Sequence, residues 1–529
     1  MTRLLLQSAT LLVVSLLSFP AARLEAAGQA APRFDQALRQ ALADGLSKHQ
    51  VIIRVEPGSR DAVLSLVREA GGRVANKSAT GAVVAELPSA ALELLSGVPG
   101  VRSVSSDSLV TTSPGFVQAA KGQGGAPVNI LRETLGLQDR ALNGSGVGVA
   151  IIDSGIAPVA GLVGKIVAFY DFTRGGIASA PSDAYGHGTH VAGLIGGTSA
   201  GGGVSGTGVA PGVRFIGLKV LNDSGQGRTS DVIAAIEFAT ANRAALGIDV
   251  INLSLGHPIF EPAESDPLVQ AVEAAVRAGI VVVTTAGNFG SNPETGLTGY
   301  AGLTSPGNSP SAITVGASNT NGTISRLDDR VAPFSSRGPT WYDAYAKPDV
   351  VAPGYRLSAA VASDSLLARW AGIEPGAGRA EHIELSGTSM AAGVTTGVVA
   401  LLLEHGRGRQ DGAVAFSPNL VKAIVEFTAI PLADETGVQY DWLTQGAGGV
   451  NAAGALALAS ALDLAAPEGC PLLPSPIEPV SLIGGDTLAW SERIVWGETE
   501  MLGDWSVWGD NIVWGHNIVW GHNIVWGHN

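Results

Sequence analysis

The chain is poor in cysteine, in charged residues and in long apolar runs, and each shortage excludes a class of protein. Cys470 is the single cysteine among 529 residues, so no disulfide can form within the chain. Charged residues make up 15% and hydrophobic residues 46%, which excludes a disordered chain and favours a globular one. The net charge of -14 argues against nucleic acid and anionic membranes as partners, because both select basic surfaces.

Residues 1–27 have the pattern of a secretory signal. Arg3 supplies the positive start, residues 4–19 supply the apolar centre, and Ala26 and Ala27 are small residues near a cleavage point. The apolar run is interrupted by polar residues and is shorter than the ~20 residues of a membrane span. We therefore expect this segment to be removed, and the protein to lie outside the cytoplasm, free or associated with the cell surface.

Residues 28–112 form a region with a pattern of its own. Apolar alternation and helical periodicity predict strands at 51–55, 81–87 and 101–110 and helices at 60–70 and 89–96. An order of βαββαβ over ~60 residues predicts a small α+β module of the ferredoxin-like kind. Residues 113–127 are small, polar and rich in glycine, which is typical of an exposed linker.

Residues 128–462 alternate apolar strands with helical patterns. We predict strands at 147–152, 214–220, 250–255, 280–285 and 312–315, and helices at 187–196, 230–245, 268–278 and 389–404. Continuous apolar strands separated by helices predict an α/β fold, a parallel sheet with helices on both faces. Ligands of such sheets bind beyond the carboxyl ends of the strands, where Asp153, Ser254 and Asn288 are expected.

Three short stretches carry residues suited to acyl transfer. Asp153 ends Val147–Gly155, His187 stands in Tyr185–Gly193, and Ser389 stands in Leu385–Val394 at the start of an apolar helix. A serine in the first turn of a helix lies near free backbone N–H groups, which favour an oxygen that develops negative charge. Aspartate, histidine and serine in this chain order form one of the known orders of the Ser-His-Asp triad.

On these motifs, the stretch from about residue 147 to 455 resembles the subtilases, the subtilisin-like serine proteases. The resemblance implies a secreted endopeptidase that hydrolyses protein or peptide substrates through an acyl-enzyme, with Ser389 as nucleophile, His187 as base and Asp153 orienting the histidine. It also implies an oxyanion hole at Asn288. The site residues expected to pair with the substrate backbone are Ser254, Leu255 and Gly256. Residues 28–112 would then be an inhibitory propeptide, cleaved near Thr112 to Pro114.

Two departures from the subtilase pattern leave alternatives open. Gly393 and Val394 stand where the family usually has Pro-His, so a catalytically impaired binding or surface protein on the same fold remains an alternative. The segment between Gly354 and Gly387 is longer than in the most similar family members, and we expect a loop at the rim of the cleft.

The sequence indicates no metal site and no required cofactor. His187 and His190 lack the i, i+4 spacing and the glutamate of a zinc protease, and we expect His190 to be a packed structural histidine. Near Leu162 and residues 204–208, where many subtilases hold calcium, this chain has small or apolar residues. Structural calcium is therefore not indicated there, and other calcium sites stay open.

The C-terminal region combines a stiff linker with a repeat. Residues 463–485 are rich in proline, and residues 486–529 contain a six-residue repeat, Asn-Ile-Val-Trp-Gly-His, whose register reaches back to Trp490. Alternating β-branched and aromatic residues favour strands over a helix. The repeat is open to three interpretations: binding of a surface or another chain, weak metal binding by His516, His522 and His528, or low-complexity sequence without a specific role. We expect the linker to separate this tail from the enzyme.

Overall fold

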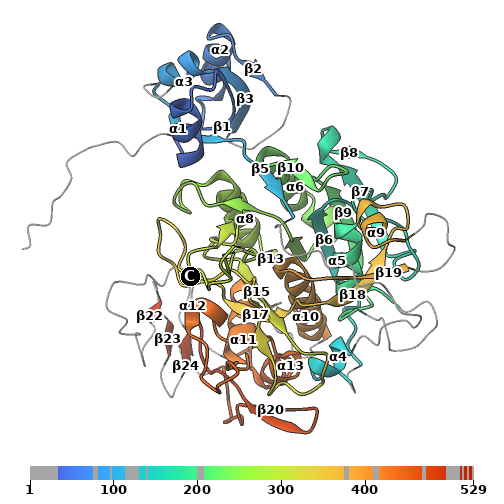
Figure 1. Cartoon of the computed structure of the whole chain (residues 1–529). Coiled ribbons are helices and arrows are strands. Elements are labelled where there is room, and N and C mark those ends of the chain that lie inside the picture. Colours follow the sequence, from blue (N-terminus) through green and yellow to red (C-terminus); the bar gives the residue numbers. More distant parts are fainter. Residues whose placement is uncertain are drawn as a thin grey trace, which may run out of the picture.

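The computed structural model consists of an N-terminal module, a large central domain and a C-terminal segment (Figure 1). It describes residues 34–75, 82–95, 98–112, 130–138, 141–198, 208–292, 294–373, 381–408, 416–466, 472–495, 513–514, 518–520 and 524–526. The expected secretory signal and the expected linker at 113–127 lie outside these residues. Within the described part of the chain, every helix is too short or too polar to span a lipid bilayer.

The central domain is built on a nine-stranded sheet with the order β16-β15-β13-β11-β6-β9-β7-β8, in which β17 also pairs with β15. Its strands are β6 (Gly148–Asp153), β7 (Ile166–Asp171), β8 (Ile177–Ala178), β9 (Arg214–Lys219), β11 (Val250–Leu253), β13 (Val281–Thr285), β15 (Ile313–Asn319), β16 (Arg330–Val331) and β17 (Val350–Pro353). All pairs are parallel except those of the short edge strands β8 and β16. The predicted parallel α/β sheet is therefore confirmed, and the chain adds strands to it that the sequence did not predict.

Helices cover both faces of this sheet because its strands are apolar on both sides. Val149 and Ile151 of β6 belong to one buried cluster, while Ala150 and Ile152 belong to the other, as alternate residues of a strand must. The first cluster includes residues of α5 (His187–Gly196), α10 (Thr388–Gly408), α11 (Pro418–Phe427) and α13 (Ala452–Ala461). The second includes residues of α6 (Thr229–Ala241) and α8 (Pro267–Arg277). Shorter helices are α4 (Leu131–Thr134), η1 (Phe172–Arg174), α7 (Arg243–Leu246), α9 (Leu366–Trp370) and α12 (Trp442–Gln445).

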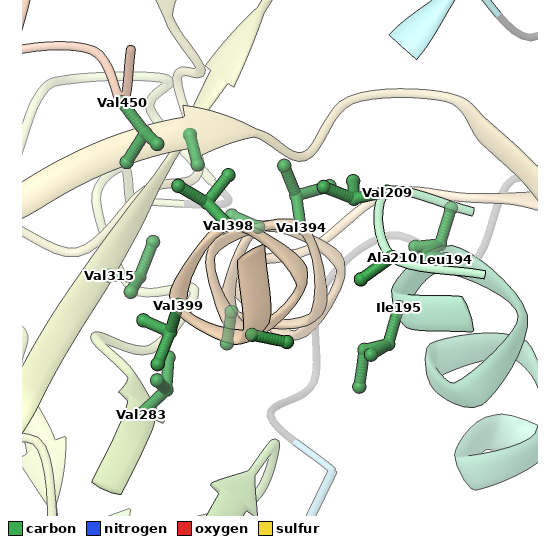
Figure 2. Packing of buried hydrophobic residues seen from close by; sticks show 14 of the residues in the cluster. Leu194, Ile195, Val209, Ala210, Val283, Val315, Val394, Val398, Val399 and Val450 are labelled. Atoms are coloured by element: carbon green, nitrogen blue, oxygen red, sulfur yellow. The ribbon is translucent and has the colours of Figure 1, made fainter. Parts of the chain in front are cut away.

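The helix α10 runs through the middle of the first cluster. Figure 2 looks along it and shows Val394, Val398 and Val399 pointing to different sides, toward residues such as Val209, Val315 and Val283. A helix that is apolar all round must be buried all round, and every residue from Thr388 to Leu403 is buried. The first turn of α10, which carries Ser389, is therefore held by the core of the domain.

The N-terminal module is a separate small fold with its own core. It contains α1 (Gln36–Ala43), β1 (Lys48–Val55), α2 (Arg60–Glu69), β2 (Arg73–Val74), β3 (Ala82–Pro88), α3 (Ser89–Leu95) and β4 (Val101–Ser106). Its sheet is antiparallel with the order β2-β3-β1-β4, and after α1 its elements follow the order βαββαβ. This strand order is that of a ferredoxin-like module. Its Ile52 and Val84 belong to the same buried cluster as α6 and α8, so the module's sheet packs on that face of the central domain.

Short two-stranded ribbons complete the domain around the sheet. They are β5 (Leu109–Thr111) with β10 (Gln226–Arg228), β12 (His257–Pro258) with β14 (Thr304–Ser305), β18 (Leu357–Val361) with β19 (Glu381–Leu385), and β20 (Val480–Ile483) with β21 (Asp486–Ala489). The first of these ribbons joins the N-terminal module to the central domain, because β5 directly follows β4 of the module.

The C-terminal hairpin packs against the central domain, which differs from the expected division into a linker at 463–485 and a tail from 486. Trp490 is 4% exposed, and its Nε1 donates to Ser481 Oγ at 2.9 Å. Asn451 Nδ2, at the start of α13, donates to the same oxygen at 2.9 Å. A boundary at residue 486 would divide the hairpin, since β21 begins there. The repeat register was extended too far, because Trp490 is a core residue.

The repeats proper are described only as three short strands, β22 (Val513–Trp514), β23 (Ile518–Trp520) and β24 (Ile524–Trp526). They pair in antiparallel fashion, with valine opposite valine and tryptophan opposite isoleucine. Their conformation agrees with the preference for strand over helix. The histidines considered as metal ligands lie outside the described residues.

Two truncations should separate the packed hairpin from the repeats. Ending the chain at Ala466 removes the buried side chains of Ile483, Leu488 and Trp490, and we expect a loss on the order of 5 kcal/mol of stability. Ending it at Val495 keeps these contacts, and we expect the melting temperature to stay within about 2 °C of the full chain. Thermal unfolding by circular dichroism measures both. Equal melting temperatures for the two truncations would contradict the packing described here.

Candidate active site

The aspartate of the site lies at the buried end of the central strand β6. Asp153 is fully buried, and its Oδ1 accepts a hydrogen bond from Ser154 N–H at 2.7 Å. His187 Nδ1 lies 2.9 Å from Oδ1 and 3.0 Å from Oδ2 of this carboxylate. Because an ionised carboxylate only accepts hydrogen bonds, Nδ1 carries the proton and Nε2 of the imidazole is left as an acceptor. The carboxylate thus fixes both the orientation and the tautomer of His187.

A second buried carboxylate, which the sequence analysis missed, positions the start of α5. Asp183 accepts hydrogen bonds from Gly186 N–H at 2.7 Å, from Thr189 N–H at 2.9 Å and from the Thr189 hydroxyl at 2.6 Å. It also accepts one from the Ser154 hydroxyl at 2.8 Å. Asp183 therefore connects the first turn of the helix that carries His187 with the residue next to Asp153. The available signal was only an aspartate four residues before the histidine, upstream of the helix start at Gly186.

The buried environment of Asp183 disfavours its ionised form. Burial raises the pKa of the Asp183 carboxyl above its ordinary value, while the hydrogen bonds from Thr189 and Gly186 oppose that rise, and the nearby charge of Asp153 adds to it. Gly188 N–H donates to Ser154 Oγ at 3.0 Å, which closes the network. The start of α5 is therefore held by a set of buried hydrogen bonds that leaves His187 little freedom.

Ser389 is the second residue of α10 and is 2% exposed. Its Oγ donates to the Ser254 carbonyl at 3.2 Å, and Ser254 Oγ donates to the Ser389 carbonyl at 3.1 Å. His187 and Ser389 line the same cavity, although in this state the serine hydroxyl bonds to Ser254. Hydrogen bonds between a nucleophile and its base are often long in the absence of substrate and tighten in the reacting complex.

Asn288 lies beside the first turn of α10 with a fixed amide orientation. Its Oδ1 accepts from Thr388 N–H at 2.9 Å and from the Thr388 hydroxyl at 3.1 Å. The NH₂ group must therefore be the other end of the amide, and Nδ2 lies 3.5 Å from the ideal Cβ position on Gly387. Gly387 and Asn288 both line the cavity. The Asn288 amide and the first turn of α10, which carries Ser389, thus lie at the same cavity.

Gly256 is the residue of the predicted substrate segment whose backbone pairs with the tail of the N-terminal module. We call the space between Gly256 and β10, which this tail occupies, the groove. Thr111 N–H donates to the Gly256 carbonyl at 3.1 Å, and Gly256 N–H donates to the Thr111 carbonyl at 3.0 Å. On its other side β5 pairs with β10, so the tail of the N-terminal module forms the middle strand of a three-stranded arrangement. The side chain of Leu255 is buried in the core, and that of Ser254 faces Asn252 and Ser389.

The cavity at the end of this tail strand has a volume of about 340 Å³. His187, Asn288 and Ser389 line it together with Thr111 and Thr112. Its described lining residues include no aspartate, glutamate, lysine or arginine. His187, Asn288 and Ser389 are thus brought together in one cleft at the carboxyl ends of the strands, and Asp153 lies buried behind it, bonded to His187.

His190 has the structural surroundings expected of it. It is fully buried, and its Nε2 donates to the carbonyls of Leu357 and Ile383, each at 3.1 Å. Burial lowers the pKa of His190 to about 3, and the nearby His187 adds to this shift, so the ring is neutral. Among the described residues, no group of three or more histidine, cysteine, aspartate or glutamate side chains is arranged to hold a metal ion.

The fold and the cleft are those of a subtilisin-like serine protease. Residues 144–453, more than half of the chain, match the Subtilase family, and the chain belongs to that family. Serine protease AprX of Bacillus subtilis is 36% identical over 318 residues, which are 59% of this chain and 66% of that protein, just under two thirds of its length. Subtilisin DY of Bacillus licheniformis is 37% identical over 267 residues, which are 50% of this chain and 80% of that protein.

A solved structure supports the same fold. Fervidolysin from Fervidobacterium pennivorans, a keratinolytic enzyme related to subtilisin, matches with a TM-score of 0.61 over 80% of this chain and 62% of that protein. At 22% identity this likeness concerns the fold alone.

Replacing Asp183 should weaken the hydrogen bonds that hold the start of α5 while leaving Asp153, His187 and Ser389 unchanged. In Asp183→Asn an NH₂ group replaces one acceptor among four donors, so we expect a loss of about 1–3 kcal/mol in stability. Because α5 then holds His187 less firmly, we expect kcat to fall roughly tenfold with KM nearly unchanged. Urea unfolding and peptide hydrolysis measure the two effects. Asp364→Asn, at an exposed position, is the matched control, and equal behaviour of the two variants would contradict the role given to Asp183.

Proposed function

We propose that this protein is a secreted serine endopeptidase that is matured by cleavage of its N-terminal module. The observation that supports this most directly is the cleft itself, where His187, Asn288 and Ser389 lie at the end of an inserted strand and Asp153 is bonded to His187 from behind. Export is part of the proposal because residues 1–27 have the pattern of a secretory signal. The proposed chemistry requires no cofactor.

The proposed reaction uses the free acceptor on His187. Ser389 Oγ attacks the peptide carbonyl carbon while its proton passes to His187 Nε2, and Asp153 stabilises the resulting imidazolium. The carbonyl oxygen becomes negative next to Asn288 Nδ2 and the Ser389 N–H. Collapse breaks the C–N bond, and His187 returns the proton to the leaving amine. Water then repeats the sequence on the acyl-enzyme, which releases the acid and restores the Ser389 hydroxyl.

Substrates are proposed to bind by strand addition. The backbone of Thr111 pairs with β10 on one side of the groove and with Gly256 on the other. An extended peptide of another protein can form the same hydrogen bonds. Main-chain pairing of this kind selects an extended conformation and leaves specificity to the side-chain pockets. Val110 is fully buried in the second cluster, so the groove also contains an apolar pocket for the side chain that takes the place of Val110.

The N-terminal module is proposed to act as the inhibitor of its own enzyme. Its tail occupies the groove and ends, as far as described, at Thr112 beside the catalytic cavity. A cleavage near Thr112 to Pro114 would leave this tail in place as a bound product. The module would therefore block the cleft until it is removed, and residues 28–112 are proposed to be the propeptide.

The alternative of an impaired enzyme rested on Gly393 and Val394. Both are buried within α10, after the turn that carries Ser389. An ideal Cβ on Gly393 would make only ordinary contacts with Val191 and Ile195, and Val394 belongs to the first buried cluster. These residues thus replace the usual pair by apolar packing, and among the described residues we find no disturbance of the helix start that would favour the alternative.

The interface between module and enzyme contains a buried acid, Glu261, which is 8% exposed. Gln36 N–H donates to the adjacent Phe260 carbonyl at 3.0 Å, and Arg54 donates to the Ser265 carbonyl at 3.1 Å. Burial raises the pKa of the Glu261 carboxyl to about 8, and the charges of Asp266 and Asp35 add to the rise. Since a free glutamate titrates near ~4.3, we expect formation of this interface to take up a proton.

Loss of the nucleophile should stop maturation. In Ser389→Ala the proposed attack on the carbonyl near Thr112 cannot occur, so we expect the precursor without its signal to accumulate and hydrolysis of a chromogenic peptide to fall at least 10⁴-fold. Gel electrophoresis and mass spectrometry of the purified protein measure the processing. Efficient cleavage of the purified variant, with other proteases excluded, would overturn both the proposed nucleophile and self-maturation.

Binding of the processed module should weaken as the pH rises. Because the pKa of Glu261 is higher in the interface than outside it, affinity is fully present below about pH 4 and is lost as the pH rises through about 8. We expect the dissociation constant to increase at least tenfold between pH 6 and pH 8, measured by gel filtration of the processed complex.

Glu261→Gln should remove most of this pH dependence. Glu264→Gln, at a neighbouring exposed position, should leave it intact. A wild-type complex with equal affinity at both pH values would rule out the linkage.

A further inference from the structure

The long segment between β17 and α10 forms a hairpin that carries the short helix α9. Its strands β18 and β19 pair from Leu357 with Leu385 to Val361 with Glu381. The helix α9 lies between them in the chain and docks beside the segment that leads to His187. Leu366 N–H donates to the Ala184 carbonyl at 2.8 Å, and Leu367 N–H donates to the Tyr185 carbonyl at 3.0 Å. The expected rim of the cleft is thus an ordered element bonded to the catalytic region.

The position of α9 is fixed by burial as well as by hydrogen bonds. Leu367 is 1% exposed, Ala368 is fully buried, and Ser365 Oγ caps the helix by accepting from Ala368 N–H at 3.3 Å. Gly186 lies so close that a Cβ there would be 2.6 Å from Ser365 Oγ. A side chain at position 186 would therefore push α9 away from His187.

Trp370 stands out from this anchored helix. It is 57% exposed, yet together with Leu367 it lines the cavity that contains His187 and Ser389. A large apolar side chain is thus held at the edge of a catalytic cavity by a helix that is anchored through Leu367 and Ala368. Its free face is available to a ligand in the cleft.

The direction of the inserted strand shows which part of a substrate α9 would meet. The strand β5 pairs with β10 and Gly256, and Thr112 follows it beside Tyr185, with the two hydroxyl oxygens 3.4 Å apart. Thr111 and Thr112 therefore line the cavity from the acyl side of the proposed cleavage site. The remaining apolar lining comes from Leu367 and Trp370 of α9, Leu385 of β19 and Met390 of α10. We expect a peptide that continues past Ser389 to enter this apolar part of the cavity.

We propose that α9 forms a binding site for the substrate residue that follows the scissile bond, and that this site selects a large apolar or aromatic side chain. The inference rests on the proposed peptidase function and adds a specificity to it. Contact with the Trp370 face and with Leu367 favours a phenylalanine or leucine over a glycine, and an aspartate would lose its hydration against uncharged walls. Differences of this kind in an apolar pocket amount to roughly tenfold in kcat/KM.

The experiment compares internally quenched peptides that differ only in the residue after the scissile bond, phenylalanine, leucine, glycine or aspartate. For the processed enzyme we expect kcat/KM to be roughly tenfold higher for phenylalanine than for glycine. In Trp370→Ala this ratio should fall to about two or less, while Trp370→Phe should keep most of it. Trp341→Ala, which removes a tryptophan that is 60% exposed and lines none of this cavity, should leave the ratio unchanged.

A peptide p-nitroanilide, which has no amino acid after the scissile bond, separates specificity from damage to the triad. The loss caused by Trp370→Ala should be roughly tenfold larger on the phenylalanine peptide than on the p-nitroanilide. Equal losses on both substrates, or an unchanged phenylalanine-to-glycine ratio, would overturn the inference alone. Failure of the wild-type enzyme to hydrolyse the p-nitroanilide would overturn the proposed function, and the inference with it.

Discussion

The burial of a carboxylate at the end of the central strand is the constraint on which the catalytic region depends. Asp153 has no access to solvent, so its oxygens must be supplied with donors by the protein. His187 and Ser154 supply them, and the geometry of the imidazole follows from that requirement. The second carboxylate, Asp183, holds the helix start from which His187 projects. Sheet, helix and imidazole are thus connected through two buried acids.

The apolar strands and the helices between them were predictable from the sequence. A parallel sheet that is covered on both faces requires continuously apolar strands, and the helices that cover it require an apolar face. The triad residues were predictable because they stand in three local motifs whose order matches a known family. Asp183 was not, since a single aspartate in a turn carries no periodicity, and only its four donors reveal its role. The helix α9 was expected only as a loop, since five residues are too few to establish a period.

The C-terminal boundary was misjudged for a different reason. Trp490 fits the six-residue register of the repeats, so the pattern assigned it to the tail, whereas packing assigns it to the core. A periodic signal in sequence cannot distinguish a tryptophan that faces a neighbouring repeat from one that faces α13. The side chain of Leu255 is buried in the core, which the motif did not indicate, because a motif identifies a segment but not the side to which each side chain points.

The C-terminal hairpin lies at the end of the central domain that is opposite to the N-terminal module. In Figure 1 the N-terminal module caps one end of the central domain, while β20, α11 and α13 lie at the opposite end. Residues 490–495 are fixed near this opposite end by Ser491 N–H, which donates to the Ala429 carbonyl, and by Glu492 N–H, which donates to the Phe427 carbonyl. The repeats therefore leave the domain far from the module. A support attached just after Val495 would therefore lie on the side of the central domain away from the module.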